Sequence, residues 1–108
     1  GSEEIAKRTF DCLKKNVPSE VPGIAFLSGG QSELEASKNL NEINKINDTN
    51  FLITYSYGRA LQASALKAFG KNQKDTKKIQ DVFAHRAKMN SLSSKGEWSE
   101  KLEKLAIA

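Results

Sequence analysis

Apolar residues recur every three or four positions along most of the chain, which is the spacing of one face of a helix. The first such stretch covers residues 3–16, with Ser2 as its expected N-cap and glutamates in its first turn. A second begins at Ser32, which forms a capping box with Glu35, and ends near Asn47. The remaining stretches predict helices over residues 59–69 and 74–92 and a short amphipathic helix over residues 98–105.

The ends and faces of the later helices are also predicted. Gly70 is expected to end the helix over residues 59–69, because glycine is common just after the last turn of a helix. Ile79, Phe83 and Ala87 lie four residues apart and form the predicted apolar face of the next helix.

Two short apolar runs, residues 24–27 and 51–55, differ from the helices because their apolar residues are consecutive. Unbroken apolar residues are typical of strands that are buried on both faces, as in parallel sheets. The order α-β-α-β-α-α therefore predicts an α/β fold with parallel strands. Two strands cannot complete such a sheet, so we expect the chain to be a piece of something larger.

Composition permits one small domain and excludes several classes of protein. The 108 residues are 38% hydrophobic and 28% charged, which indicates neither a disordered chain nor a membrane protein. The single Cys12 cannot form an internal disulfide, and this fits a reducing, cytoplasmic compartment. The net charge of +4 is compatible with a polyanion, but the charges are mixed and aromatic residues are not interleaved with them. We therefore expect a solvated helical surface and no nucleic-acid partner.

Both predicted strands end in loops that suit an anion: Ser28-Gly29-Gly30 after the first and Gly58-Arg59 after the second. Glycines let a phosphate approach backbone N–H groups, and a helix follows each loop, so its dipole also favours an anion. Ser28 adds a hydroxyl donor, and Arg59 a guanidinium that can contact two oxygens. Because the carboxyl ends of neighbouring parallel strands lie side by side, we predict one phosphate clamped between the loops.

The residue types alone leave a simpler interpretation open. Ser-Gly-Gly is common in turns, so a purely structural loop is the more frequent explanation. Neither G-x-x-x-x-G-K-[ST] nor G-x-G-x-x-G occurs, which argues against a nucleoside triphosphate loop or a dinucleotide fold. His85 is the single histidine, so we expect a surface or packing role and no metal site. Cys12 is expected to be a small packing residue.

Longer motifs add a resemblance to a known family. Residues 21–32 (VPGIAFLSGGQS) resemble the segment of the seventh barrel strand in class I fructose-bisphosphate aldolases. Residues 56–68 (SYGRALQASALKA) resemble the segment after the eighth strand. Residues 39–44 and 86–92 match the intervening and following helices. The resemblance covers residues 3–96, with both long motifs in the family's order.

The resemblance implies a (β/α)8 TIM barrel in which this chain supplies about strands 7 and 8 with their flanking helices. Residues 1–108 would be the C-terminal part of a single aldolase barrel domain, and 93–108 its C-terminal tail. The family cleaves fructose 1,6-bisphosphate to dihydroxyacetone phosphate and glyceraldehyde 3-phosphate through a Schiff base, without a metal or cofactor. The residues that the motifs assign to a substrate phosphate are Ser28, Gly29, Gly58 and Arg59.

The chain also departs from the family's pattern. The Schiff-base lysine is expected upstream, so no catalytic residue is assigned, and the chain without the remainder of the barrel is predicted to be inactive. The family's tail ends in a tyrosine, whereas this chain ends in Leu-Ala-Ile-Ala. The resemblance implies a homotetramer for the intact protein. The alternative function is a non-catalytic module whose basic stretch, residues 71–78, binds an acidic protein such as actin.

Overall fold

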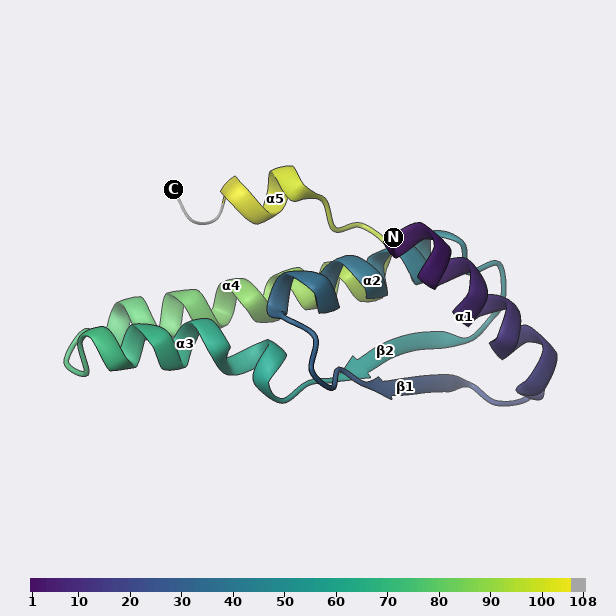
Figure 1. Ribbon diagram of the computed structural model, residues 1–108, viewed down its shortest axis with the longest axis horizontal. Helices are drawn as coiled ribbons and strands as arrows, with labels where there is room; N and C mark the ends of the chain where they lie inside the picture. The colour runs from purple at the N-terminus through teal and green to yellow at the C-terminus, as the bar shows by residue number, and fades with distance from the viewer. Residues whose placement is uncertain (106–108) are drawn as a thin grey trace.

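The computed structural model describes residues 1–105, and its elements follow the predicted order (Figure 1). The helices are α1 (Ser2–Asn16), α2 (Glu33–Lys45), α3 (Arg59–Lys71), α4 (Thr76–Ser94) and α5 (Glu100–Leu105), and the strands are β1 (Gly23–Leu27) and β2 (Leu52–Ser56). Each element lies where the apolar pattern predicts it, with ends that differ by a few residues. No helix in the described range is long and apolar enough to cross a membrane.

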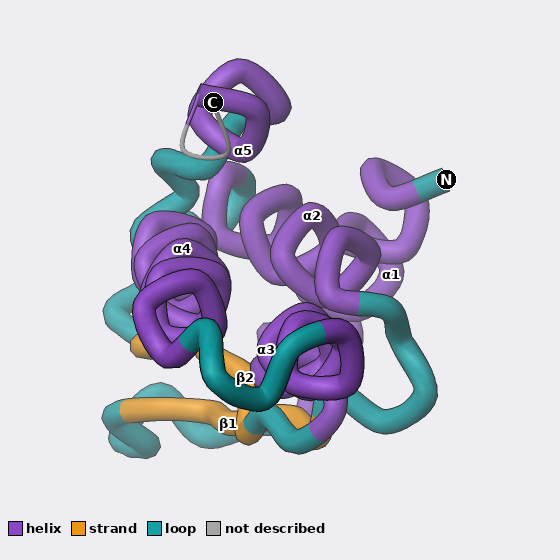
Figure 2. Tube along the Cα trace, turned by 90° about the vertical axis from the view of Figure 1, so that its left-hand side faces the viewer, coloured by secondary structure: helices purple, strands orange, loops and turns teal. Residues whose placement is uncertain are grey.

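The strands β1 and β2 pair in parallel, with Gly23 opposite Leu52 and Leu27 opposite Ser56. The predicted parallel pairing is therefore confirmed. Helices α2 and α4 contact β2, α1 packs on α2, and α3 packs along α4. Figures 1 and 2 show α1, α2 and α4 on the same side of the strands, while the α3–α4 hairpin extends beyond their carboxyl ends.

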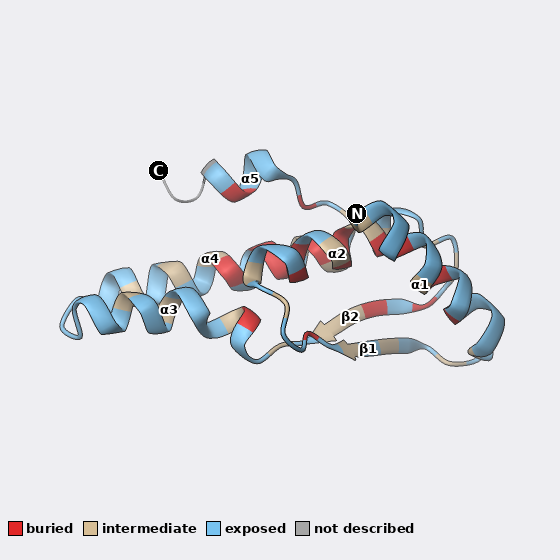
Figure 3. Cartoon of the chain, viewed as in Figure 1, coloured by how far each residue is buried: buried red, intermediate tan, exposed pale blue. Residues whose placement is uncertain are grey.

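The main core lies between α1, α2 and the covered face of the sheet. Phe10, Leu40 and Ile53 are at most 3% exposed and belong to one cluster, which Phe26 and Tyr55 border. Figure 3 shows buried positions where α1, α2 and β2 face one another, and further ones where α4 lies beside α2. Burial of each large apolar side chain contributes about 1.5–3 kcal/mol. This core fixes α2, and hence the loop before it, over the strands.

The opposite face of the sheet is bare, contrary to the prediction that both strands are buried on both faces. Leu27 is 81% exposed and Leu52 is 77% exposed, whereas Ile53 is 2% exposed. Successive side chains of a strand point to opposite faces. Because the described helices cover one face, burial alternates along β1, and the exposed Leu52 is followed by the buried Ile53 in β2.

Three local predictions about α1 and α3 are wrong. Ser2 is the first helical residue, and Gly1 is the N-cap without a side-chain hydrogen bond. Helix α3 continues through Gly70 to Lys71, because packing on α4 outweighs the cost of about 1 kcal/mol for a helical glycine. Cys12 is exposed and therefore has no packing role.

Apart from Met89, the buried residues of α4 are polar, and the predicted apolar face is wrong. Phe83 is 40% exposed and Ala87 is exposed, whereas Arg86, Asn90 and Ser93 are buried. Polar side chains can be buried when hydrogen bonds satisfy them, and the spacing of apolar residues does not reveal such a face.

Candidate anion-binding site

The loops that follow β1 and β2 meet at one edge of the sheet. The register ends with Leu27 opposite Ser56, and the Ser28 N–H then donates to the Ser56 carbonyl oxygen at 3.1 Å. Arg59 begins α3 just beyond this contact. The structure therefore brings both predicted loops to the same edge, with the candidate residues Ser28, Gly29, Gly58 and Arg59.

The turn after β1 is tied firmly to its surroundings. Gly29 has a φ of 59°, a left-handed conformation that glycine adopts without steric cost. Gln31 donates to the Ser28 carbonyl oxygen from its N–H at 3.3 Å and from its Nε2 at 3.1 Å, and its Oε1 accepts from Asn39 at 2.8 Å. Ser28 is 3% exposed, and a Cβ added at Gly29 or Gly30 would meet nothing within 4 Å. The open surface of this turn is therefore mainly glycine backbone.

Both loops lead into the N-terminus of a helix. Ser32 caps α2 by accepting from the Glu35 N–H at 3.1 Å, which is the capping contact that the sequence predicts. Gly58 is the N-cap of α3 and makes no side-chain cap, so no side chain occupies the positive end of that helix dipole at its cap. Arg59 is exposed, and its guanidinium has no ion pair within residues 1–105.

Aromatic side chains pack along the covered face of the sheet below this edge. The ring of Tyr55 lies edge-on to Phe26 at 6.3 Å and tilted against Tyr57 at 5.8 Å between centroids. Burial raises the pKa of Tyr55, with an opposing effect from the Gln31 side chain. Burial, reinforced by Tyr55, also raises the pKa of Tyr57, whose buried hydroxyl has no hydrogen-bond partner among the described residues. Both phenols are therefore neutral at physiological pH.

Sequence reasoning missed a buried polar cluster behind the site, centred on Arg86. Its guanidinium donates to Glu103 through Nη1 at 2.8 Å and Nη2 at 2.9 Å, and Nη1 also donates to Ser37 Oγ at 3.0 Å. Ser37 in turn donates to Asn90 Oδ1 at 2.6 Å. These contacts join α2, α4 and α5. Partners so distant along the chain produce no local sequence signal, so the cluster could not be predicted.

Glu103 is the shared acceptor at the α5 end of this cluster. Besides Arg86, it accepts from Trp98 Nε1 at 3.2 Å, and its Oε2 lies 2.5 Å from His85 Nε2. Burial opposes ionisation of Glu103, but hydrogen bonds from Arg86, His85 and Trp98, with the Arg86 charge, together lower the pKa of its carboxyl. His85 therefore packs against α5. Residues 1–105 contain no group of three His, Cys, Asp or Glu side chains placed to bind a metal ion.

The sequence of the whole chain matches one family of known proteins. A family model described as "Fructose-bisphosphate aldolase class-I" matches residues 1–108. The chain belongs to the class I fructose-bisphosphate aldolases. It is 52% identical over 97 residues to the muscle-type aldolase of Lethenteron camtschaticum and 49% identical over 96 residues to aldolase 1 of Toxoplasma gondii. Each match covers 89% of this chain, and the chain spans only 27% and 26% of those two aldolases.

A solved aldolase structure has the same arrangement of elements. It is the fructose-bisphosphate aldolase of Plasmodium falciparum, in a complex with TRAP and a small-molecule inhibitor. The two chains are 41% identical and superpose with a TM-score of 0.86 over 92% of this chain and 28% of the other. The family resemblance and the α/β class read from the sequence are therefore confirmed. The chain corresponds to about a quarter of an aldolase.

Proposed function

We propose that this chain supplies the substrate-phosphate site of a class I fructose-bisphosphate aldolase, with β1 and β2 as strands 7 and 8 of its (β/α)8 barrel. The intact enzyme would cleave fructose 1,6-bisphosphate to dihydroxyacetone phosphate and glyceraldehyde 3-phosphate. The proposed phosphate ligands are Ser28, Gly29, Gly58 and Arg59. The observation that carries the proposal is the backbone hydrogen bond from Ser28 to Ser56, because it joins the two loops.

Three features of these loops suit a sugar phosphate. The open backbone at Gly29 lets phosphate oxygens approach N–H groups without a side chain between them. The N-terminus of α3 lacks a side-chain cap at Gly58, and its dipole favours an anion. Arg59 is exposed at the same helix start and can contact two phosphate oxygens with its planar guanidinium. Together these groups would offer an anion partial positive charge from backbone N–H groups and the full charge of Arg59.

The phosphate contacts would act on the reaction by positioning the substrate. A Schiff base on a lysine elsewhere in the barrel would withdraw electrons, so the bond between C3 and C4 breaks to give an enamine. Anchoring the phosphate places the substrate carbonyl beside that lysine, and such positioning is worth several kcal/mol. No residue of this chain is assigned to the bond-breaking step itself.

The bare face of the sheet supports the proposed place in a barrel. Parallel strands are normally covered on both faces. Exposed leucines such as Leu27 and Leu52 therefore indicate that another part of the protein packs on this face. The other barrel strands and their side chains would bury this face. Residues 93–108 would then form the C-terminal tail, of which residues 106–108 lie outside the described range. A homotetramer and a cytoplasmic location remain predictions.

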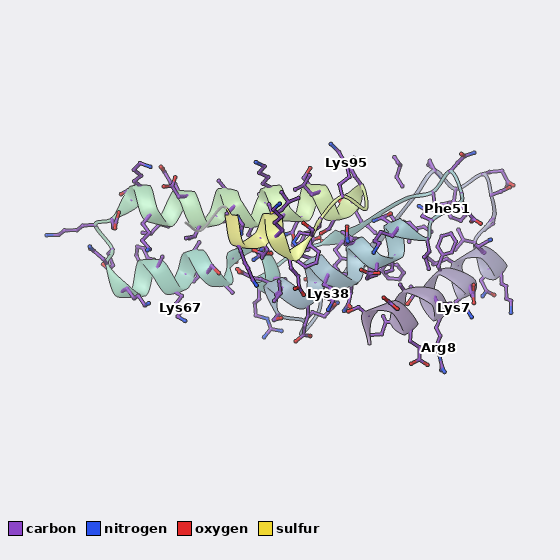
Figure 4. All side chains as sticks on the ribbon, turned by 90° about the horizontal axis from the view of Figure 1, so that it is seen from above. Lys7, Arg8, Lys38, Phe51, Lys67 and Lys95 are labelled. Carbon is purple, nitrogen blue, oxygen red and sulfur yellow. The ribbon has the colours of Figure 1, made fainter. Side chains whose placement is uncertain are left out.

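The test compares Arg59→Ala with Lys67→Ala in the intact aldolase that contains this chain. Both substitutions remove one positive charge from an exposed position on α3, and Figure 4 shows Lys67 pointing outward from that helix. Loss of charge-assisted hydrogen bonds worth about 1.5–3 kcal/mol should raise the KM for fructose 1,6-bisphosphate about tenfold to a hundredfold in Arg59→Ala. Lys67→Ala should leave KM unchanged.

Arg59→Lys refines the interpretation, because lysine keeps the charge but loses the bidentate geometry. We expect its KM to lie between the parent and Arg59→Ala. An Arg59→Ala enzyme with the parent's KM and turnover would refute the assignment of Arg59. Equal increases in Arg59→Ala and Lys67→Ala would show a general charge effect and would likewise refute it.

The alternative function, a basic module for an acidic partner, has weaker support. The labelled basic side chains of Figure 4 come from separate parts of the fold: Lys7 and Arg8 from α1, Lys38 from α2, Lys67 from α3 and Lys95 from the end of α4. In the stretch over residues 71–78, Lys77 pairs with Asp81 at 3.0 Å. Binding of TRAP is stated for the Plasmodium aldolase. Actin or another acidic partner remains a prediction for this chain.

A further inference from the structure

One carboxylate joins the two helices that begin at the proposed phosphate site. Glu33 follows the Ser32 N-cap in the first turn of α2, and its side chain is 10% exposed. Its Oε1 accepts from the Ser64 backbone N–H of α3 at 2.7 Å, and its Oε2 accepts from the Ser64 hydroxyl at 2.5 Å. Arg86 of α4 places its Nε 3.4 Å from the same Oε2, an ion-pair contact without a hydrogen bond.

The contact from Ser64 is unusual for a helix. Beyond the first turn, a backbone N–H normally donates to the carbonyl oxygen four residues earlier. Here that N–H donates to a charged side chain of another helix, and hydrogen bonds to an ionised acceptor are shorter and stronger than neutral ones. Because both carboxylate oxygens of Glu33 contact Ser64, the pair sets the orientation of α3 as well as its distance from α2.

We propose that Glu33 is a positioning residue for the phosphate site: it sets the N-terminus of α3, with Arg59, relative to the glycine turn that precedes α2. This inference rests on the proposed function. The turn at Gly29 is fixed to α2 through the Gln31–Asn39 hydrogen bond. The Glu33–Ser64 contact then connects α2 to α3, so the two halves of the clamp keep one separation. Arg86 lies against the carboxylate and compensates its charge.

The direction in which KM changes when Glu33 is removed distinguishes a positioning role from a direct electrostatic effect on the anion. A negative carboxylate close to an anion site repels the anion, so its removal by itself should tighten substrate binding. If Glu33 sets the geometry of the clamp, its removal should instead weaken binding. The two explanations therefore predict opposite changes in KM for the same substitution.

The experiment measures kcat and KM for fructose 1,6-bisphosphate in the intact aldolase with Glu33→Ala, Glu33→Gln or Glu35→Ala. We expect Glu33→Ala to raise KM about tenfold with kcat almost unchanged, as for a lost contribution to uniform binding. Glu33→Gln should be intermediate, because its amide oxygen can still accept from the Ser64 N–H and its amide nitrogen can donate to the hydroxyl. Glu35→Ala removes the same charge from an exposed position on the same turn, and KM should stay level or fall.

Several outcomes would overturn the inference. Equal KM values in Glu33→Ala and Glu35→Ala would leave no role for the Ser64 contact. A lower kcat with unchanged KM would reflect a smaller folded fraction and would also contradict positioning. If Glu33→Ala does not fold, Ser64→Ala is measured instead; it deletes only the contact to Oε2, and KM should rise about threefold. An unchanged KM in Ser64→Ala would then overturn the inference.

Arg59→Ala distinguishes failure of this inference from failure of the proposed function. If Arg59→Ala raises KM and Glu33→Ala does not, only the positioning role of Glu33 is wrong. If Arg59→Ala leaves KM unchanged, the phosphate site itself is wrong, whatever Glu33→Ala does.

Discussion

Glu103 is the residue of α5 whose side chain contacts the rest of the chain most extensively. The substitution Glu103→Ala removes all the contacts of this carboxylate at once. The carboxylate accepts from Arg86 at 2.8 and 2.9 Å and from Trp98 at 3.2 Å, and it contacts His85. The side chain of Glu103 is 11% exposed and that of Arg86 is 8% exposed. The substitution therefore leaves a buried guanidinium without its main partner.

The expected cost follows from this burial. Removing one partner of a buried ion pair costs about 3–5 kcal/mol. Glu33 remains 3.4 Å from Arg86 Nε, and undocking of the short helix α5 would let water reach the guanidinium. Both effects limit the cost, so we expect about 3 kcal/mol. This corresponds to a shift of roughly 100-fold in the equilibrium between docked and undocked α5.

Hydrogen–deuterium exchange of a peptide that covers α5 measures this equilibrium in the intact protein. The Glu103 N–H donates to the Ser99 carbonyl oxygen at 3.1 Å, so its exchange requires opening of the helix. Exchange should be roughly 100-fold faster in Glu103→Ala. Peptides from α1 should exchange as in the parent, because α1 packs mainly on α2.

Glu100→Ala is the matched control, because Glu100 belongs to the same helix and is exposed. Exchange of the α5 peptide in Glu100→Ala should stay within a few-fold of the exchange in the parent. Equal exchange of α5 in Glu103→Ala and Glu100→Ala would refute the argument that the Arg86 pair attaches this helix. Faster exchange of α1 to the same degree as α5 would refute the local character of the effect.

Two pH effects follow from the shifted groups. The folded-state pKa of Glu103 is lowered, so its stabilisation is complete above the unfolded value of 4.5 and is lost as pH falls through the folded value. The difference in unfolding free energy between the parent and Glu103→Gln should therefore shrink from pH 7 to pH 3, and a constant difference would contradict the shift. The folded-state pKa values of Tyr55 and Tyr57 are raised, so the stabilisation that depends on their neutral phenols is complete below the unfolded value of 10.0 and is lost as pH rises through the folded values. Urea unfolding should show a decline in stability above pH 10. The decline should be smaller in Tyr57→Phe, with no loss of stability at pH 8, because the Tyr57 hydroxyl has no hydrogen-bond partner within residues 1–105.

The elements of this fold and the loops of its candidate site can be read from the sequence because their signals are local. Apolar spacing marks α2 through Leu40 and Ile43, and Ser32 caps that helix as its position predicts. Glycines at the ends of two apolar runs mark the loops, and parallel strands bring those loops together. The assignment of a phosphate to them required the family's motifs, since Ser-Gly-Gly alone is also common in structural turns.

Tertiary structure alone decided which surfaces are buried and which distant residues meet. Leu27 and Leu52 are as apolar as Ile53, yet the described helices cover only one face of the strands, so only Ile53 is buried. The buried polar cluster joins Glu33, Arg86 and Glu103, which belong to three different helices. A charged residue within a helix has the same local pattern whether it lies in solvent or in an ion pair, because its partner comes from elsewhere in the chain. The sequence by itself therefore determined the helices, the strands and the glycine loops, while the packing of the helices decided how Glu33 and Arg86 support them.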